Sequence, residues 1–185
     1  MGNRAVITTA DNFKNNGVGV YLHWNGGRDS VEAFLKYCDM QGYREPSEDC
    51  YGWAYLCGVI SNFFSDGLSV GIDVIDHLDC DNGDNGVYII EGWKIVDRKY
   101  NNTIESEDLN NYKPIKMIKE INDCMPERMK LDSSEIIHPF TNDGEKMVDF
   151  LRLSKEEFMM SYSYLTEEEY EATCDAIMRK IKDGE

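Results

Sequence analysis

Fourteen consecutive residues, Tyr51 to Phe64, carry no charged side chain, and this stretch restricts the fold more than any other feature of the sequence. Trp53, Leu56 and Ile60 are among its large apolar residues, and nearly every side of a helix built from it would be apolar. Such a helix is stable only when its surroundings remove it from water. We therefore expect it to be the central, buried helix of a globular domain.

Short segments rich in β-branched residues surround that helix and predict strands over residues 4–9, 18–24, 68–78, 87–91 and 93–100. We expect the first two to pair as a hairpin across the turn-forming stretch 11–17, and Gly92 to mark a bulge or bend. A second helix is expected up to Met40, with Asp29 as its N-cap and Glu32 three residues later. The pattern predicts an α+β fold, an antiparallel sheet of about five strands with two helices on one face.

The character of the chain changes after residue 100. A polar linker is expected over 101–111, followed by a helix over 113–124. Two capping boxes, Ser154 with Glu157 and Thr166 with Glu169, each predict the start of a helix. In the last helix one apolar stripe is expected from Tyr170, Cys174, Ile177, Met178 and Ile181. We interpret residues 1–100 as an acidic α+β core domain and 101–185 as a mainly helical extension packed on it, which could also form a homodimer.

The charge balance points away from nucleic acids and membranes. The chain has 35 acidic against 19 basic residues, a net charge of −16, so phosphate and anionic lipid would repel it. Residues 45–93 contain ten acids and no Lys or Arg, interleaved with apolar residues that would hold the carboxylates on a folded surface. Such an array could occupy the basic groove of a nucleic-acid-binding protein; alternatively, it only keeps the protein in solution. The candidate partner-binding residues are Asp66, Asp73, Asp76, Asp79, Asp81, Asp84 and Glu91.

Metal sites are the rival interpretation of the acidic turn at residues 79–86. Counted from Asp81, the spacing follows a calcium loop only in part, because Gly83 offers no ligand and the twelfth position is Gly92 instead of Glu. His77 and Cys80 could be zinc ligands, but no second pair of soft ligands accompanies them. We therefore expect no metal and no cofactor.

The string from His23 to Asp29 is the most distinctive local motif. Two glycines before a helix can present free N–H groups to an anion, so His23, Asn25, Gly26, Gly27 and Arg28 form a possible anion or ligand turn. The alternative, which we favour, is that the glycines only permit a tight strand-to-helix turn. A nucleophile at Cys50, assisted by His23, would make the protein a small hydrolase, but no orienting signature accompanies that pair. We assign no catalytic residue.

The six cysteines are irregularly spaced, and several occupy apolar helical positions. With no apolar signal region in the first residues, we expect reduced thiols and a cytoplasmic protein.

Three strings, GNRAVIT from Gly2, VGVYLHWNGGRDS from Val18 and YGWA from Tyr51, resemble a family of small proteins from Gram-positive bacteria, their phages and plasmids. The resemblance covers roughly residues 1–100. It implies that the protein belongs to a mobile element and is related to anti-CRISPR inhibitors of Cas9. Together with the charge, it predicts an acidic inhibitor that occludes the nucleic-acid groove of a DNA-targeting effector.

Overall fold

The computed structural model describes residues 2–46, 50–65, 69–100, 114–132, 136, 153–161 and 167–183. The chain divides into two compact units, Met1–Lys130 and Leu131–Glu185. The first unit continues past residue 100, because the helix α5 (Pro114–Cys124) packs on helices of the first hundred residues. Packing of the C-terminal region on the core stays a prediction.

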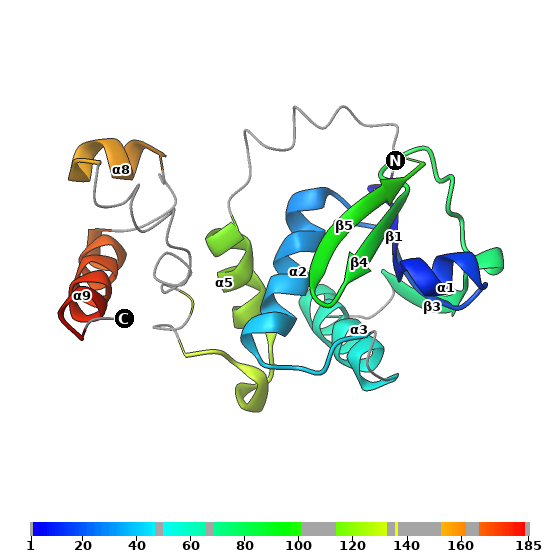
Figure 1. Cartoon of the computed structure of the whole chain (residues 1–185), viewed down its shortest axis with the longest axis horizontal. Helices are drawn as coiled ribbons and strands as arrows, with labels where there is room; N and C mark the ends of the chain where they lie inside the picture. Colours follow the sequence, from blue (N-terminus) through cyan, green and yellow to red (C-terminus); the bar gives the residue numbers. More distant parts are fainter. Residues whose placement is uncertain are drawn as a thin grey trace. The chain divides into compact units, whose positions relative to one another are not determined.

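Five strands form one sheet in the order β3-β2-β1-β4-β5, which confirms the α+β class and the number of strands (Figure 1). The strands are β1 (Ala5–Thr9), β2 (Val18–Leu22), β3 (Val70–Val74), β4 (Val87–Glu91) and β5 (Lys94–Lys99). β1 and β2 pair antiparallel, as expected. β4 and β5 also pair antiparallel through the turn at Gly92, with an irregularity between Ile89 and Ile90. β3 is shorter than expected, because residues 75–77 form the 3-10 turn η1.

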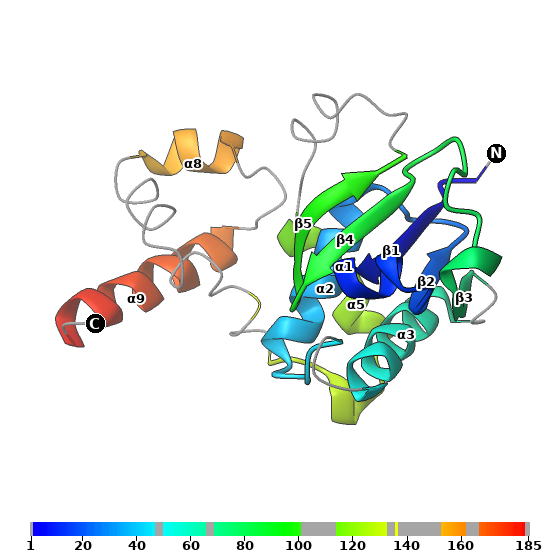
Figure 2. The same ribbon diagram turned by 45° about the vertical axis from the view of Figure 1, so that its right-hand side comes forward.

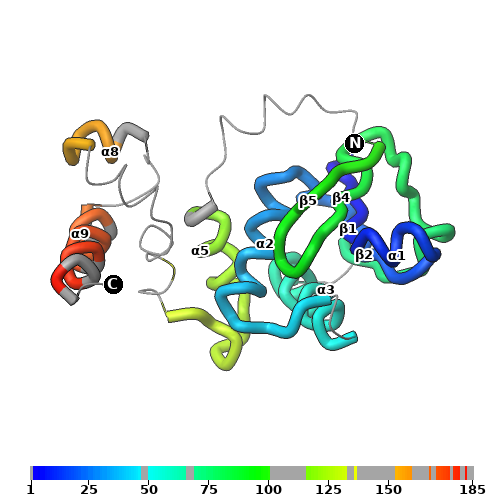
Figure 3. Tube along the Cα trace, viewed as in Figure 1, coloured from blue at the N-terminus to red at the C-terminus, as the bar shows by residue number. Residues whose placement is uncertain are grey.

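The sheet is mixed, and the prediction of an antiparallel sheet was wrong in this respect. β4 runs parallel to β1, with Val6 opposite Val87 and Thr8 opposite Ile89. β3 and β4 are therefore not neighbours joined by a turn, and the chain between them crosses the sheet past β2 and β1 (Figure 3). Parallel pairing requires such a crossover. We call residues Ile75–Gly86 the acidic crossover.

One face of the sheet is covered by helices. Figure 2 shows α2 (Arg28–Met40) and α3 (Cys50–Phe64) together on one side of the strands. Side chains alternate along a strand, and the strand residues on this side, Ala5, Ile7, Val20 and Leu22, are fully buried. α5 packs against both helices and adds a further layer.

The opposite face is covered by the acidic crossover. Ile75, Leu78 and Cys80 pack with Val6, Val87 and Ile89 in one apolar cluster. The contact is so close at β2 that a Cβ on Gly19 would lie 2.8 Å from Leu78 Cδ1. The cluster is completed by Phe13 of α1 (Ala10–Lys14), a short helix where a turn was expected. The Thr9 hydroxyl caps α1 by accepting from Asn12 N.

α3 is buried on one side only, which corrects the prediction of an all-round buried helix. Its buried residues are Gly52, Trp53, Leu56, Val59 and Ile60. Tyr51 and Tyr55 on the other side are 57% and 37% exposed. The stretch is uncharged, but the first unit provides packing partners for one face of the helix.

The N-cap of α2 is Gly27, so the capping box predicted at Asp29 was wrong. Asp29 lies within the first turn, where its carboxylate accepts from Ser30 N at 2.7 Å. The helix begins one residue before Asp29 because Gly27 takes the extended conformation of a cap, with φ −61° and ψ 152°.

The second unit contains α8 (Lys155–Ser161) and α9 (Glu167–Asp183). The capping box at Ser154 is confirmed, with Ser154 Oγ 2.8 Å and Ser154 N 3.0 Å from Glu157 Oε2. Thr166 lies outside the described residues. In α9, Ile177 is buried whereas Met178 is 61% exposed, so Met178 does not belong to the buried stripe. None of the helices in the described ranges is long and apolar enough to cross a membrane.

Candidate partner-binding surface

Four of the exposed carboxylates of the first unit lie close together in the sequence, along the end of β3 and the acidic crossover. Asp73, Asp76, Asp79 and Asp81 are all exposed. The apolar side chains between them, Ile75, Leu78 and Cys80, point into the cluster on the sheet and hold the backbone in place. Asp66, another acid predicted for this surface, lies outside the described residues.

Asp84 is held by Arg4 and does not face outward as a free charge. Arg4 Nε donates to Asp84 Oδ2 at 2.7 Å, and the Arg4 backbone N–H donates to the same oxygen at 3.1 Å. The hydrogen bond from the Arg4 side chain is the main reason why the pKa of Asp84 lies below its ordinary value. Arg4 also pairs with Asp79 at 3.5 Å, although the Asp79 side chain remains 55% exposed. One arginine, directly before β1, thus contacts two acids of the acidic crossover.

Two buried asparagines organise the crossover, and sequence reasoning missed both. Asn82 Nδ2 donates to the carbonyls of Asp79 and Gly86, while Asn82 Oδ1 accepts from the N–H groups of Asp84 and Gly86. Asn85 Nδ2 donates to Asn3 Oδ1 and to the Arg4 carbonyl. Each asparagine precedes a glycine with positive φ, and this repeated Asn-Gly pair is the signal that could have identified them.

Asp73 lies on the edge strand β3. Its Oδ1 accepts from Val74 N at 2.7 Å and lies 3.2 Å from His77 Nδ1. The backbone hydrogen bond from Val74, followed by the one from His77, keeps the pKa of Asp73 below its ordinary value. Asp73 is therefore ionised at neutral pH, and 52% of its side chain is exposed.

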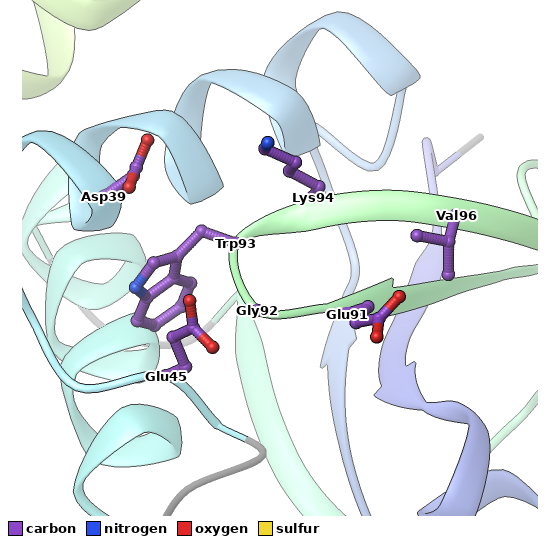
Figure 4. A pocket seen from close by; sticks show the side chains of 7 residues that line it. All are labelled: Asp39, Glu45, Glu91, Gly92, Trp93, Lys94 and Val96. Carbon is purple, nitrogen blue, oxygen red and sulfur yellow. The ribbon is translucent and has the colours of Figure 1, made fainter.

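Glu91 does not belong to the surface predicted for it, because it ends β4 at the opposite end from the crossover. There it lines a pocket of about 450 Å³ together with Asp39, Glu45, Gly92, Trp93, Lys94 and Val96. Figure 4 shows the Glu45 carboxylate facing Gly92 beside the Trp93 indole, and a Cβ on Gly92 would lie 2.7 Å from Glu45 Oε1. The pocket is a separate acidic locus.

In the turn from His23 to Arg28, two groups that an anion would use, the Gly26 N–H and the Arg28 side chain, already have partners within the protein. Gly26 N donates to the Asn3 carbonyl at 2.8 Å, and a Cβ there would lie 2.6 Å from that oxygen. Arg28 Nε pairs with Glu32 Oε1 at 2.8 Å. Asn25 takes φ +53°, and His23 is exposed beside Trp24. The favoured interpretation, a tight turn that requires glycine, agrees with this geometry.

The thiols differ in their surroundings. Burial raises the pKa of Cys38, and burial raises that of Cys57 to about 11. Cys50 is exposed at the start of α3, and within the described residues no hydrogen bond links it to His23. The described part of the chain also contains no group of three or more His, Cys, Asp or Glu side chains placed to hold a metal ion.

Comparison with protein-family models, with curated proteins and with solved structures found no match.

Proposed function

We propose that this protein acts by binding, with the exposed acids Asp73, Asp76, Asp79 and Asp81 docking on the basic nucleic-acid groove of another protein. The observation that supports this most is their common position on one short, well-supported segment. We call these four residues the acidic surface. Residues 69–91 contain no Lys or Arg that could neutralise it from within.

The framework beneath the acidic surface favours recognition over mere solubility. A carboxylate on a flexible tail loses conformational freedom on binding, and that loss weakens the complex. Here Asn82 and Arg4 fix the crossover, and its apolar residues are packed on the sheet. The carboxylates can therefore meet a basic groove with little ordering cost.

The partner class follows from the charge. A groove lined by Lys and Arg is the protein surface that attracts such an array best, and occupying it excludes DNA or RNA by sterics and by repulsion. The resemblance of the first hundred residues to anti-CRISPR-related proteins makes Cas9 the specific candidate. Inhibition requires no turnover in this scheme.

The test is a competition experiment between this protein and target DNA for guide-loaded Cas9. The variant changes Asp76, Asp79 and Asp81 to Lys, leaving Asp84 and its structural bonds intact. The control changes Glu120, Asp123 and Glu127 to Lys, three exposed acids on or next to α5 with the same change in net charge. We expect the first variant to bind at least about tenfold more weakly and with less salt dependence, and the control to bind nearly as well as the wild type.

An equal loss of affinity for Cas9 in both variants would show that only net charge matters. The acidic surface would then serve only to keep the protein in solution. Absence of binding by the wild type to Cas9 would contradict the choice of effector. Retention of a different basic, nucleic-acid-binding protein from a Gram-positive lysate, competed by DNA, would keep the proposed mode and replace the partner.

A further inference from the structure

The edge strand β3 presents backbone groups that no described strand uses. β3 is the terminal strand of the sheet and pairs only with β2. Ser69 O accepts from His23 N, and Ile75 N donates to Gly17 O. In an antiparallel pair the bonded positions alternate, so residues 69, 71, 73 and 75 bond to β2. The N–H and C=O groups of Val70, Ile72 and Val74 therefore point away from the sheet, and of these N–H groups the one of Val74 already donates to Asp73 Oδ1.

The two sides of this edge differ in chemistry. On the helix-covered side lie Val70, Ile72 and Val74, and Ile72 is 55% exposed. On the side of the acidic crossover lie Gly71 and Asp73, followed by the exposed Asp76. A strand added here would meet apolar side chains on one of its faces and carboxylates on the other.

We propose that β3 accepts an extended, basic segment of a partner protein by strand addition, with Lys or Arg alternating with apolar residues. This inference rests on the proposed function and specifies how the acidic surface engages its partner. Backbone hydrogen bonds would supply affinity, and the alternating side chains would supply selectivity.

Asp73 also disfavours a second copy as the occupant. Two β3 edges brought together would place two Asp73 carboxylates and their neighbouring Asp76 residues close to each other, and charge at an edge is a common protection against self-pairing. The opposite edge strand, β5, also carries an aspartate, Asp97, whose Oδ1 accepts a hydrogen bond from Arg98 N at 2.7 Å. β5, however, carries three cations, Lys94, Arg98 and Lys99, whereas β3 carries none. Only the β3 edge therefore suits a basic strand.

The experiment measures amide hydrogen exchange by NMR on the full chain, with and without a ten-residue peptide of alternating lysine and valine. At saturation we expect the Val70 and Ile72 amides to exchange at least about tenfold more slowly. The Gly71 and Asp73 amides, already bonded to β2, serve as internal references. A peptide with glutamate in place of lysine is the control for charge and should leave all four amides unchanged.

Two matched variants identify the edge. Asp73→Lys should weaken binding of the lysine peptide by about tenfold or more, while Asp97→Lys, the equivalent change on β5, should have little effect. Ile72→Pro should abolish the slowed exchange, because it removes an outward N–H without breaking a bond to β2. If Ile72→Pro does not fold, the Asp73 and Asp97 pair still decides.

Peptide binding without slower exchange at Val70 and Ile72 would overturn strand addition and leave docking by charge alone. Slow exchange at Val70 and Ile72 in the protein without peptide would also overturn strand addition, because the edge would already be covered. If dilution restores fast exchange, a second copy covers the edge. If dilution has no effect, other residues of the same chain cover it. Partner binding that survives Ile72→Pro but not the Asp76, Asp79 and Asp81 variant would overturn this inference alone. If the lysine peptide slows exchange at Val70 and Ile72 but the protein binds no nucleic-acid-binding effector, the proposed function is overturned and strand addition is not.

Discussion

Asparagine side chains, more than the aspartates around them, determine the conformation of the acidic crossover. Asn82 is only 4% exposed, and its amide bridges backbone groups at Asp79, Asp84 and Gly86. Its neighbour Asp81 is exposed. The buried amide therefore closes the loop, and the exposed carboxylates are carried on it.

We expect Asn82→Ala to lower the free energy of unfolding by about 2 kcal/mol or more, because buried backbone groups lose their partners and cannot reach water. Asp81→Ala should change it by no more than about 0.5 kcal/mol, since the side chain is exposed. Urea denaturation followed by circular dichroism measures both. A cost for Asn82→Ala as small as that for Asp81→Ala would mean that the crossover does not depend on the amide.

At the scale of elements, a polar contact ties α5 to the core. The Tyr37 hydroxyl of α2 lies 2.7 Å from both Asn122 Oδ1 of α5 and the carbonyl oxygen of Met129. Gln41 Nε2 donates to the same hydroxyl at 3.2 Å. Tyr37 is fully buried, and Asn122 is 9% exposed. Through this hydroxyl, α2 holds α5 and the 3-10 turn η3 (Glu127–Met129) as parts of one unit.

Replacement of Tyr37 by Phe should destabilise the protein by about 1–3 kcal/mol, because the Asn122 amide and the Met129 carbonyl would be left less well bonded in a buried place. Hydrogen exchange in α5 should rise together with the loss of stability measured in urea. Tyr55→Phe, at a tyrosine on the open side of α3, is the matched control and should be nearly neutral. Unchanged exchange in α5 would show that apolar packing alone holds that helix.

At the scale of the whole molecule, negative charge is in large excess and is unevenly distributed. Residues 45–93 contribute −10 of the net −16. Repulsion among like charges opposes the compact state, and salt screens it over about 10 Å at 0.1 M. Arg4 offsets part of this repulsion locally, at Asp84 and Asp79.

Raising sodium chloride from about 20 mM to about 0.5 M should increase the urea concentration at the unfolding midpoint, because screening weakens the net repulsion. The Asp76, Asp79 and Asp81 to Lys variant has a net charge of −10 (−16 plus 6) and should show a smaller increase. A midpoint that falls with salt would contradict this expectation and indicate that ion pairs such as Arg4–Asp84 outweigh the repulsion.

Local pattern was sufficient to predict most elements. The expected strands and the helices at 29–40, 51–64 and 113–124 are present, and so is the helix that follows the Ser154 capping box. Each depends on periodicity or on capping between residues close in sequence. The exposed position of Asp73, Asp76, Asp79 and Asp81 also follows from composition, because unpaired carboxylates are costly to bury.

Local sequence patterns thus predicted most of the helices and strands, the α+β class and the outward position of most acids. Three features became known from the three-dimensional fold alone: β1 and β4 run parallel, Asp84 pairs with Arg4, and Glu91 lies away from the acidic surface. Arg4 and Asp84 are 80 positions apart, and the paired residues of β1 and β4, such as Val6 and Val87, are 81 apart (87 minus 6). Contacts over such distances depend on how the chain crosses the sheet, and a pattern between near neighbours carries no information about that crossing.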